Sequence, residues 1–194
     1  DDSLYVTRIA PDNVEVAKAV GEWAASTFPD GGNYVVLEGP AGVGVVNERN
    51  EGWAEGLGDS SLELVDAQTA NWSAEEGKSV FETMLKANGN DIQLVFAQND
   101  EMGLGAAQAA EEAGLVVGED VQIATIDGTK GAMEALAAGD LSFVHEYNPL
   151  FGETAVEVVN QALAGEEVES YIIVPSESFD SPEAAEAVLA DRQY

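Results

Sequence analysis

Five side chains suited to binding a polyhydroxylated ligand lie at or just beyond short apolar runs of the sequence. Trp72 has a broad apolar ring face, on which the C–H face of a sugar can stack. Arg49 carries a planar fork of N–H donors, and the amide of Asn99 both donates and accepts, as a hydroxyl does. The carboxylates of Asp127 and Glu146 accept from hydroxyls. Together these residues predict a concave site rich in hydrogen bonds.

Most of these residues also have a simpler structural interpretation. Trp72 can pack over a helix end, and Arg49 can form an ion pair within the protein. Asp127 lies before a glycine, where an aspartate often serves only to make a turn. Asp100 stands at the start of a predicted helix, so we expect it to be the N-cap rather than a ligand contact.

The residue patterns that enzymes use are absent from the sequence. His145 is the single histidine, it falls inside a predicted strand, and no Gly-x-Ser-x-Gly elbow accompanies it. There is no cysteine, no histidine pair and no D-x-D-x-D-G calcium loop, and the small-residue turn at 39–44 lacks the Lys-Ser/Thr of a P-loop. Asp127 and Glu146 have the side chains of a glycosidase pair, but sequence does not give their separation. We expect no catalysis, no cofactor and no metal.

The chain is strongly acidic, with 37 Asp and Glu against 7 Lys and Arg and a formal net charge of -30. Nucleic-acid binding rests on cations that neutralise phosphates, so neither DNA nor RNA is expected as a partner. We interpret the acidity as a solvated surface that favours solubility. No apolar run reaches the ~18–20 residues of a membrane helix, and the first residues lack a signal sequence. We expect no membrane insertion of this segment and an export signal upstream of it.

Short apolar runs alternate with longer stretches at helical spacing along the whole chain. Ser73, with Glu76 three residues later, fits a capping box, and glycines follow several helix ends. Such alternation predicts an α/β fold with a doubly wound, mostly parallel sheet, in which ligands bind beyond the carboxyl ends of the strands. Strands are expected at residues 4–9, 34–38, 62–67, 94–97, 122–126, 143–146 and 172–174, and helices at 13–28, 45–57, 74–88, 100–113, 130–138, 151–164 and 182–191.

Several stretches resemble the ribose-type solute-binding proteins of ABC sugar importers. They are residues 96–106 (FAQNDEMGLGA), residues 39–53, which end in ERNEGW, and residues 126–129 (IDGT). Residues 8–13 (RIAPDN), and Glu146 followed by Asn148 and Pro149, look closest to the galactofuranose-binding branch. The similarity runs over essentially the whole chain. It implies the type I periplasmic-binding-protein fold, in which two lobes joined by a three-stranded hinge close on one monosaccharide and then dock on an ABC permease.

Matched by motif, the ligand contacts of the C-terminal lobe in this family fall on Arg49, Trp72, Asn99 and Asp127, with Glu146 at the hinge. In ribose binders the hinge position looks like Gln and the stacking position like Phe. Glu146 and Trp72 stand there instead, which argues against assuming ribose. The resemblance also implies a periplasmic or extracellular location, and it allows a lipid anchor in a segment upstream of the chain.

The resemblance further implies that most of the N-terminal lobe lies outside this chain. We expect residues 11–146 to form the C-terminal sugar-binding lobe, with residues 176–194 returning to it. Residues 1–10 and 147–175 would be the hinge and a remnant of the N-terminal lobe. The helix at 151–164 and the strand at 171–174 would then expose an apolar face. We expect this segment to pack aberrantly, to repack on the C-terminal lobe, or to swap into a homodimer.

Two other functions share this fold and these strand-end motifs. One is the sugar-sensing effector domain of a LacI-type transcription regulator, which would carry a helix-turn-helix upstream and would normally avoid such acidity near DNA. The other is the sensor domain of a chemoreceptor or kinase, which would carry a transmembrane segment at one end. Both depend on sequence outside the chain.

Overall fold

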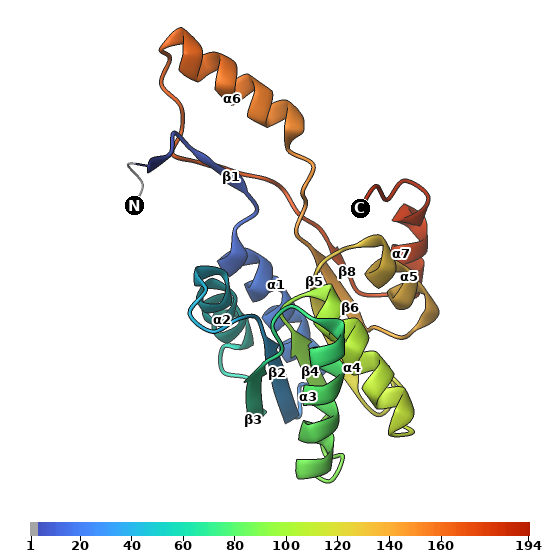
Figure 1. Cartoon of the computed structure of the whole chain (residues 1–194). Helices are drawn as coiled ribbons and strands as arrows, with labels where there is room; N and C mark the ends of the chain where they lie inside the picture. The colour runs from blue at the N-terminus through green and yellow to red at the C-terminus, as the bar shows by residue number, and fades with distance from the viewer. Residues whose placement is uncertain (1–3) are drawn as a thin grey trace.

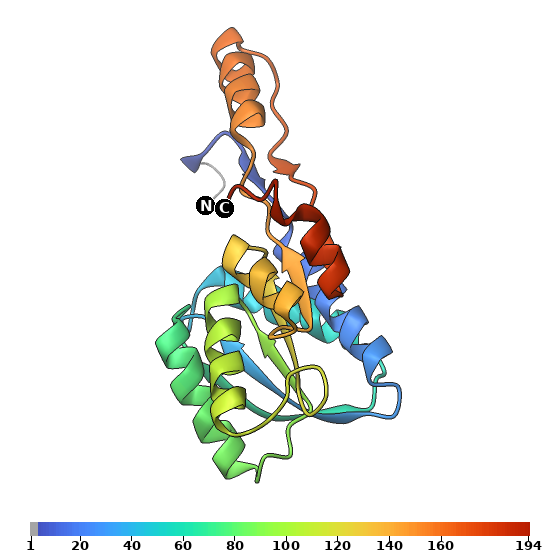
Figure 2. The ribbon, with the colours of Figure 1, turned by 90° about the vertical axis from the view of Figure 1, so that its right-hand side faces the viewer.

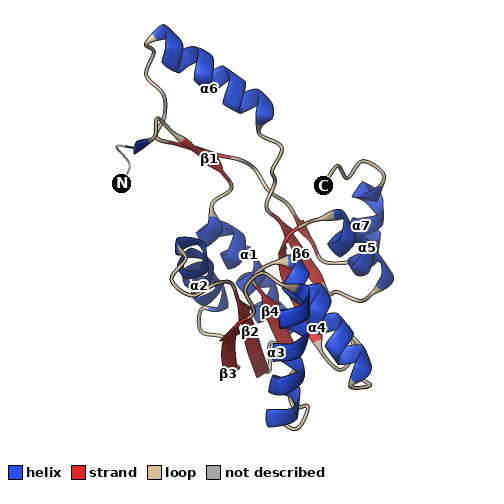
Figure 3. Ribbon diagram, viewed as in Figure 1, coloured by secondary structure: helices blue, strands red, loops and turns tan. Residues whose placement is uncertain are grey.

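The main body of the protein is a six-stranded sheet with strand order β3-β2-β4-β5-β6-β8, shown by a computed structural model that describes residues 4–194 (Figures 1 and 3). Each strand is parallel to its neighbour except β8, which is antiparallel to β6. The strands of this sheet are β2 (Gly32–Glu38), β3 (Leu62–Thr69), β4 (Leu94–Ala97), β5 (Gln122–Asp127), β6 (Phe143–Glu146) and β8 (Ser178–Phe179). The helices are α1 (Asn13–Thr27), α2 (Gly44–Leu57), α3 (Ala74–Ala87), α4 (Asp100–Glu112), α5 (Lys130–Ala138), α6 (Gly152–Ala164) and α7 (Pro182–Leu189).

Helices cover both faces of this sheet, and each face has its own apolar core. On one face α1 and α2 pack on the sheet, where the ring of Trp53 stacks on Phe96 with 4.4 Å between centroids. On the other face α3, α4, α5 and α7 enclose a second cluster around Phe81 and Met133. The central strand β4 is buried along its whole length, as expected for a parallel strand covered on both sides. Within residues 4–194 no helix is both long enough and apolar enough to cross a membrane.

Glycines let the paired helices approach one another at backbone distance. On α2, a Cβ added to Gly52 would lie 2.0 Å from the carbonyl oxygen of Val14 on α1, and one added to Gly56 would lie 2.2 Å from the carbonyl oxygen of Lys18. The pair α3 and α4 repeats this arrangement, because a Cβ at Gly105 would lie 2.1 Å from the carbonyl oxygen of Ala74. Side chains larger than hydrogen do not fit at these positions.

A second, smaller unit stands apart from the body (Figures 1 and 2). In it, β1 (Arg8–Ala10) pairs in parallel with β7 (Tyr171–Ile173), and α6 lies beside them. Along α6, Val158 is buried, whereas Val156, Val159 and Leu163 are 62%, 55% and 83% exposed. The helix therefore carries an apolar face that nothing in the described part of the chain covers.

The predicted fold class is confirmed, and the corrections concern short elements. The strand expected at 4–9 begins only at Arg8, because its partner β7 offers just three residues for pairing. The strand expected at 172–174 is Tyr171–Ile173, and the two-residue strand β8 was not predicted. The capping box is half formed: Ser73 Oγ accepts from the Glu76 N–H, but the Glu76 carboxylate accepts from the amide of Asn71 instead of returning to Ser73.

Candidate functional site

Four of the five predicted site residues line one cavity of about 250 Å³. The cavity lies where β2, β3, β4 and β5 end, so each side chain comes from a different strand-to-helix connection or from the helix that follows it. This is the edge at which ligands bind in open parallel sheets. The lining residues are Val43, Val45, Arg49, Trp72, Asn99 and Asp127.

Among the described residues that line the cavity, Arg49 is the one cation, and its side chain is almost fully buried, with 6% exposed. Its Nε donates to Asn13 Oδ1 at 3.2 Å, its Nη1 to the carbonyl oxygen of Gln98, and its Nη2 to Asp127 Oδ1 at 3.3 Å. A buried guanidinium needs such partners to offset its lost hydration. Their positions on α1, after β4 and at the end of β5 hold the guanidinium across the sheet edge.

Trp72 lies in a left-handed turn before α3, with φ of 61° after an Asn71 φ of 52°. Its indole rests against the backbone of Gly39, where an added Cβ would lie 1.9 Å from Trp72 Cζ2. The guanidinium carbon of Arg49 lies 5.7 Å from the centroid of the indole, within cation–π range. The ring is thus fixed by its neighbours while the residue remains half-buried. That geometry suits an apolar platform for a flat ligand face.

Asn99, not Asp100, caps α4, which corrects the sequence-based expectation. Its Oδ1 accepts from the Met102 N–H at 3.0 Å, and its Nδ2 is 3.5 Å from the carbonyl oxygen of Trp72. Both residues have N-cap chemistry, and the extended backbone of Asn99 decides which one caps the helix. One lone pair of Asn99 is therefore used inside the protein, and the long Nδ2 contact leaves the amide donor available.

Asp100 is fully buried and joins α4 to the next strand and helix. Its Oδ1 accepts from Thr125 Oγ1 at 2.7 Å, and its Oδ2 accepts from the N–H and the hydroxyl of Thr129 at 2.7 and 2.8 Å. Burial, together with the nearby Asp127 carboxylate, raises the pKa of Asp100 to about 7, although these hydrogen bonds act in the opposite direction. The carboxyl holds the loop 127–129 against the start of α4.

Asp127 ends β5 with φ of 130°, a conformation that non-glycine residues rarely adopt. Its side chain is 34% exposed and pairs with Arg49. Burial raises the pKa of Asp127 to about 6, and the Arg49 charge acts in the opposite direction. Strained backbone of this kind concentrates at functional sites, and here it presents a carboxylate to the cavity.

These two raised pKa values make stability depend on pH in a defined direction. A carboxyl whose pKa is higher when folded stabilises the protein fully below its unfolded value of 3.8, and this contribution is lost as pH rises through the folded value. The parent chain should lose this contribution as pH rises, whereas Asp100→Asn has no carboxyl to titrate. The free energy of unfolding of Asp100→Asn minus that of the parent is therefore expected to increase by about 2–4 kcal/mol from pH 4 to pH 8. Urea unfolding across this range measures the difference.

The control for this comparison is Glu111→Gln, which removes an exposed carboxylate from the same helix. Its free energy of unfolding should change with pH in parallel with that of the parent chain. If Asp100→Asn also runs parallel to the parent, Asp100 titrates normally and the interpretation of its buried network is wrong.

Glu146, the fifth predicted residue, is not among the residues that line the cavity. It ends β6, in register with Asp127 of β5, and its side chain is 9% exposed. Its Oε1 accepts from Arg192 Nη1 at 2.7 Å and from the Tyr194 hydroxyl. This engagement leaves Glu146 poorly suited to act as a free acid or base beside Asp127.

Sequence reasoning missed the residues that hold the site. Asn13 and Gln98 are buried partners of Arg49, and both lie in stretches that carry the family resemblance. Arg192 stands out as a cation in a chain with few, yet nothing in its spacing links it to Glu146.

The lone His145 is buried, with Nδ1 2.8 Å from Ser178 Oγ, and burial lowers its pKa to about 4. No cluster of three or more potential metal ligands occurs among residues 4–194.

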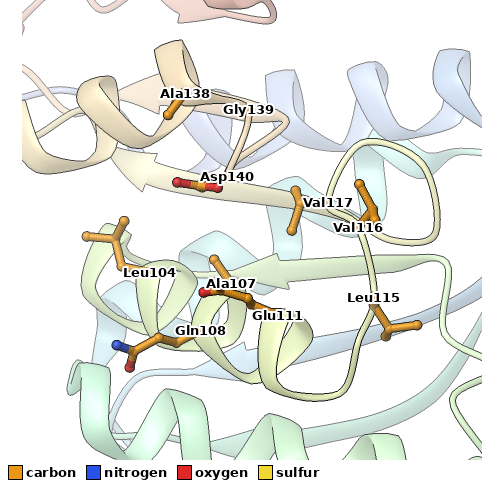
Figure 4. Close-up of a pocket in the computed structure, with 10 residues that line it drawn as sticks. All are labelled: Leu104, Ala107, Gln108, Glu111, Leu115, Val116, Val117, Ala138, Gly139 and Asp140. Carbon is orange, nitrogen blue, oxygen red and sulfur yellow. The ribbon is translucent and has the colours of Figure 1, made fainter.

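A larger cavity of about 530 Å³ lies at the opposite ends of the strands (Figure 4). It is bounded by α4, by the segment before β5 and by the turn from α5 to β6. Leu104, Ala107 and Leu115 line it together with the carboxylates of Glu111 and Asp140. None of the predicted site residues is found there.

Residues 1–167 match the family model described as a periplasmic binding protein domain. The chain belongs to the periplasmic binding protein family. A similar curated protein is the fructose import binding protein FruE of Bifidobacterium longum, 46% identical over 184 residues, which are 94% of this chain and 55% of the relative. The galactofuranose-binding protein YtfQ of Escherichia coli is 32% identical over 165 residues, 83% of this chain and 52% of the relative.

Several solved structures superpose closely on the chain. A protein from Mycobacterium smegmatis in complex with β-D-fucofuranose has a TM-score of 0.93 and 38% identity, over 100% of this chain and 64% of that one. A galactofuranose-binding protein has a TM-score of 0.92 and 30% identity, over 99% of this chain and 66% of that one. The chain thus spans about half the length of the curated relatives it matches.

Proposed function

We propose that this chain is part of the solute-binding component of an ABC sugar importer, which binds one monosaccharide and does not transform it. The observation that carries the proposal is the cavity in which an indole face, a guanidinium, an amide and a carboxylate meet at neighbouring strand ends. These are the groups that a sugar ring with its hydroxyls requires. The relatives are named as binding proteins for import, which supports this function over a LacI-type regulator.

In this proposal the sugar stacks on Trp72, and its hydroxyls bond to Arg49, Asn99 and Asp127. The sheet body, residues 11–146 with 176–194, is the C-terminal lobe, and β1, α6 and β7 belong to the second lobe. Glu146 stands at the crossing between them. Closure of the two lobes would follow from contacts that the sugar makes only in the closed state.

The ligand that we propose is a monosaccharide in its furanose form. Similar proteins are described with galactofuranose, with β-D-fucofuranose and with L-arabinofuranose, which supports a five-membered ring. Ribose and fructose, named for other relatives, are the competing ligands. A periplasmic or extracellular location and docking on a permease follow from the same assignment. A lipid anchor, and a homodimer formed by exchange of α6 and β7, remain predictions.

A fluorescence titration of the 194-residue chain tests this function. Galactofuranose, ribose, fructose and arabinose are added in turn, and we expect one of them to change the emission saturably, because Trp72 lines the cavity. Trp72→Phe should abolish the signal and weaken binding about tenfold, since stacking area is lost. Trp53→Phe is the control, because Trp53 lies in the core. If calorimetry with the same sugars detects no binding either, the proposal is wrong for this chain.

A further inference from the structure

The last residues of the chain return to the strand ends next to the candidate site. After α7, Arg192 places its side chain between the ends of β5 and β6. Its Nη1 donates to Glu146 Oε1 at 2.7 Å, and its Nε donates to the carbonyl oxygen of Gly128 at 2.6 Å. The side chain is 7% exposed, so both bonds are made in a largely dehydrated environment.

Further contacts fix this returning segment. The guanidinium carbon of Arg192 lies 4.5 Å from the ring centroid of Tyr194 and 5.6 Å from that of Phe179. The Tyr194 hydroxyl donates to the same Oε1 of Glu146, and the Tyr194 carbonyl oxygen accepts from the Lys130 N–H at 2.6 Å. The segment is therefore bound to β6 on one side and to the start of α5 on the other.

The two groups that Arg192 holds are the immediate neighbours of the candidate contact Asp127. Gly128 follows Asp127 in the chain, and Glu146 faces Asp127 in the register of β5 and β6. The N–H of Tyr147, the residue after Glu146, donates to the Asp127 carbonyl oxygen at 2.9 Å, so the ends of β5 and β6 are also joined directly. Asp127 is strained, and a strained residue persists only where its surroundings determine its position.

We infer that Arg192 is a positioning residue for sugar binding: it fixes the Asp127 carboxylate and Glu146 relative to each other without itself lining the cavity. An arginine suits this task, because its planar fork serves two acceptors at once, whereas lysine offers a single compact charge. A Cβ at Gly128 would lie 2.3 Å from Arg192 Nη2, so the glycine is needed for the guanidinium to approach. The effect of Arg192 on sugar affinity rests on the proposed function. Its effect on the backbone position of Asp127 and Glu146 does not.

The first test needs no sugar. Amide hydrogen exchange is measured on the full 194-residue chain for Arg192→Gln and for Arg192→Lys, which keeps the charge. We expect exchange at Lys130 and Tyr147 to become about tenfold faster or more, with no change at Val36 and Phe96 in the sheet centre. The control is Lys78→Gln, which removes a cation from the more exposed pair with Glu112. Unchanged exchange at Lys130 and Tyr147 in both variants overturns the inference.

The second test measures affinity for the sugar that the parent chain binds best in the titration above. Arg192→Lys should bind it about tenfold more weakly under conditions where the variant is fully folded. A purely structural role predicts a lower urea midpoint with unchanged affinity, and that result also overturns the inference. If the parent chain binds no sugar, the proposed function fails, and amide exchange alone decides whether Arg192 fixes these strand ends.

Discussion

Asp127→Ala is expected to weaken sugar binding by about 30- to 1,000-fold. The carboxylate is the acceptor that pairs with Arg49 in the cavity wall, at 3.3 Å from Nη2. Its removal leaves this guanidinium nitrogen and the ligand hydroxyls without a partner in a dehydrated site, which costs about 2–4 kcal/mol. Calorimetric titration of the parent chain and the variant with the same sugar gives the ratio directly.

Asp140→Ala is the matched control, because Asp140 is an exposed aspartate in the cavity at the opposite end of the strands. It should bind sugar as tightly as the parent chain. Asp127→Asn keeps one acceptor oxygen and should fall between the parent and the alanine variant. Equal affinities for all of these chains would remove Asp127 from the site.

Gly52→Ala is expected to lower the free energy of unfolding by about 3–5 kcal/mol, although it replaces a glycine inside a helix. The added methyl would lie 2.0 Å from the Val14 carbonyl oxygen and 3.0 Å from the Lys18 N atom, and both are backbone atoms of α1. Since backbone cannot move aside as a side chain does, α2 has to separate from α1. Urea unfolding at constant pH measures this loss.

Gly44→Ala on the same helix is the control, because a Cβ at Gly44 would meet nothing within 4 Å. There the ordinary advantage of alanine in a helix applies, and stability should stay level or rise by up to about 1 kcal/mol. If Gly52→Ala unfolds at the same urea concentration as Gly44→Ala, the α1 and α2 backbones separate at little cost in free energy, and the prediction is wrong.

The sheet, and the meeting of four candidate side chains at one of its edges, could be predicted because both follow from repeating patterns. Alternation of apolar runs and helical stretches leaves few topologies, and parallel strands bring their carboxyl ends to one edge. Arg49, Trp72, Asn99 and Asp127 follow four such strands, so the rule alone brings them together. The motif resemblance implies ligand contacts at the same four residues.

The differences from the sequence-based expectations come from contacts that no local pattern encodes. Asn99 and Asp100 have the same capping chemistry, and the burial of Asp100 against Thr125 depends on how α4 meets β5. Glu146 has a strand-end position like the other four, but a segment almost fifty residues later occupies its carboxylate. The length of β1 is set by its partner β7 rather than by its own sequence.

The glycine contacts described above also determine where the molecule can bend. Helices that touch through backbone atoms cannot slide past each other without collision. The pair α1 and α2, and the pair α3 and α4, are therefore each expected to move as one rigid unit with the sheet. A displacement of β1, α6 and β7 relative to this rigid block must then be absorbed by the short connections at 11–12, 147–151 and 174–177. Changes in a few backbone torsion angles of these connections are therefore enough to move the smaller unit relative to the sheet.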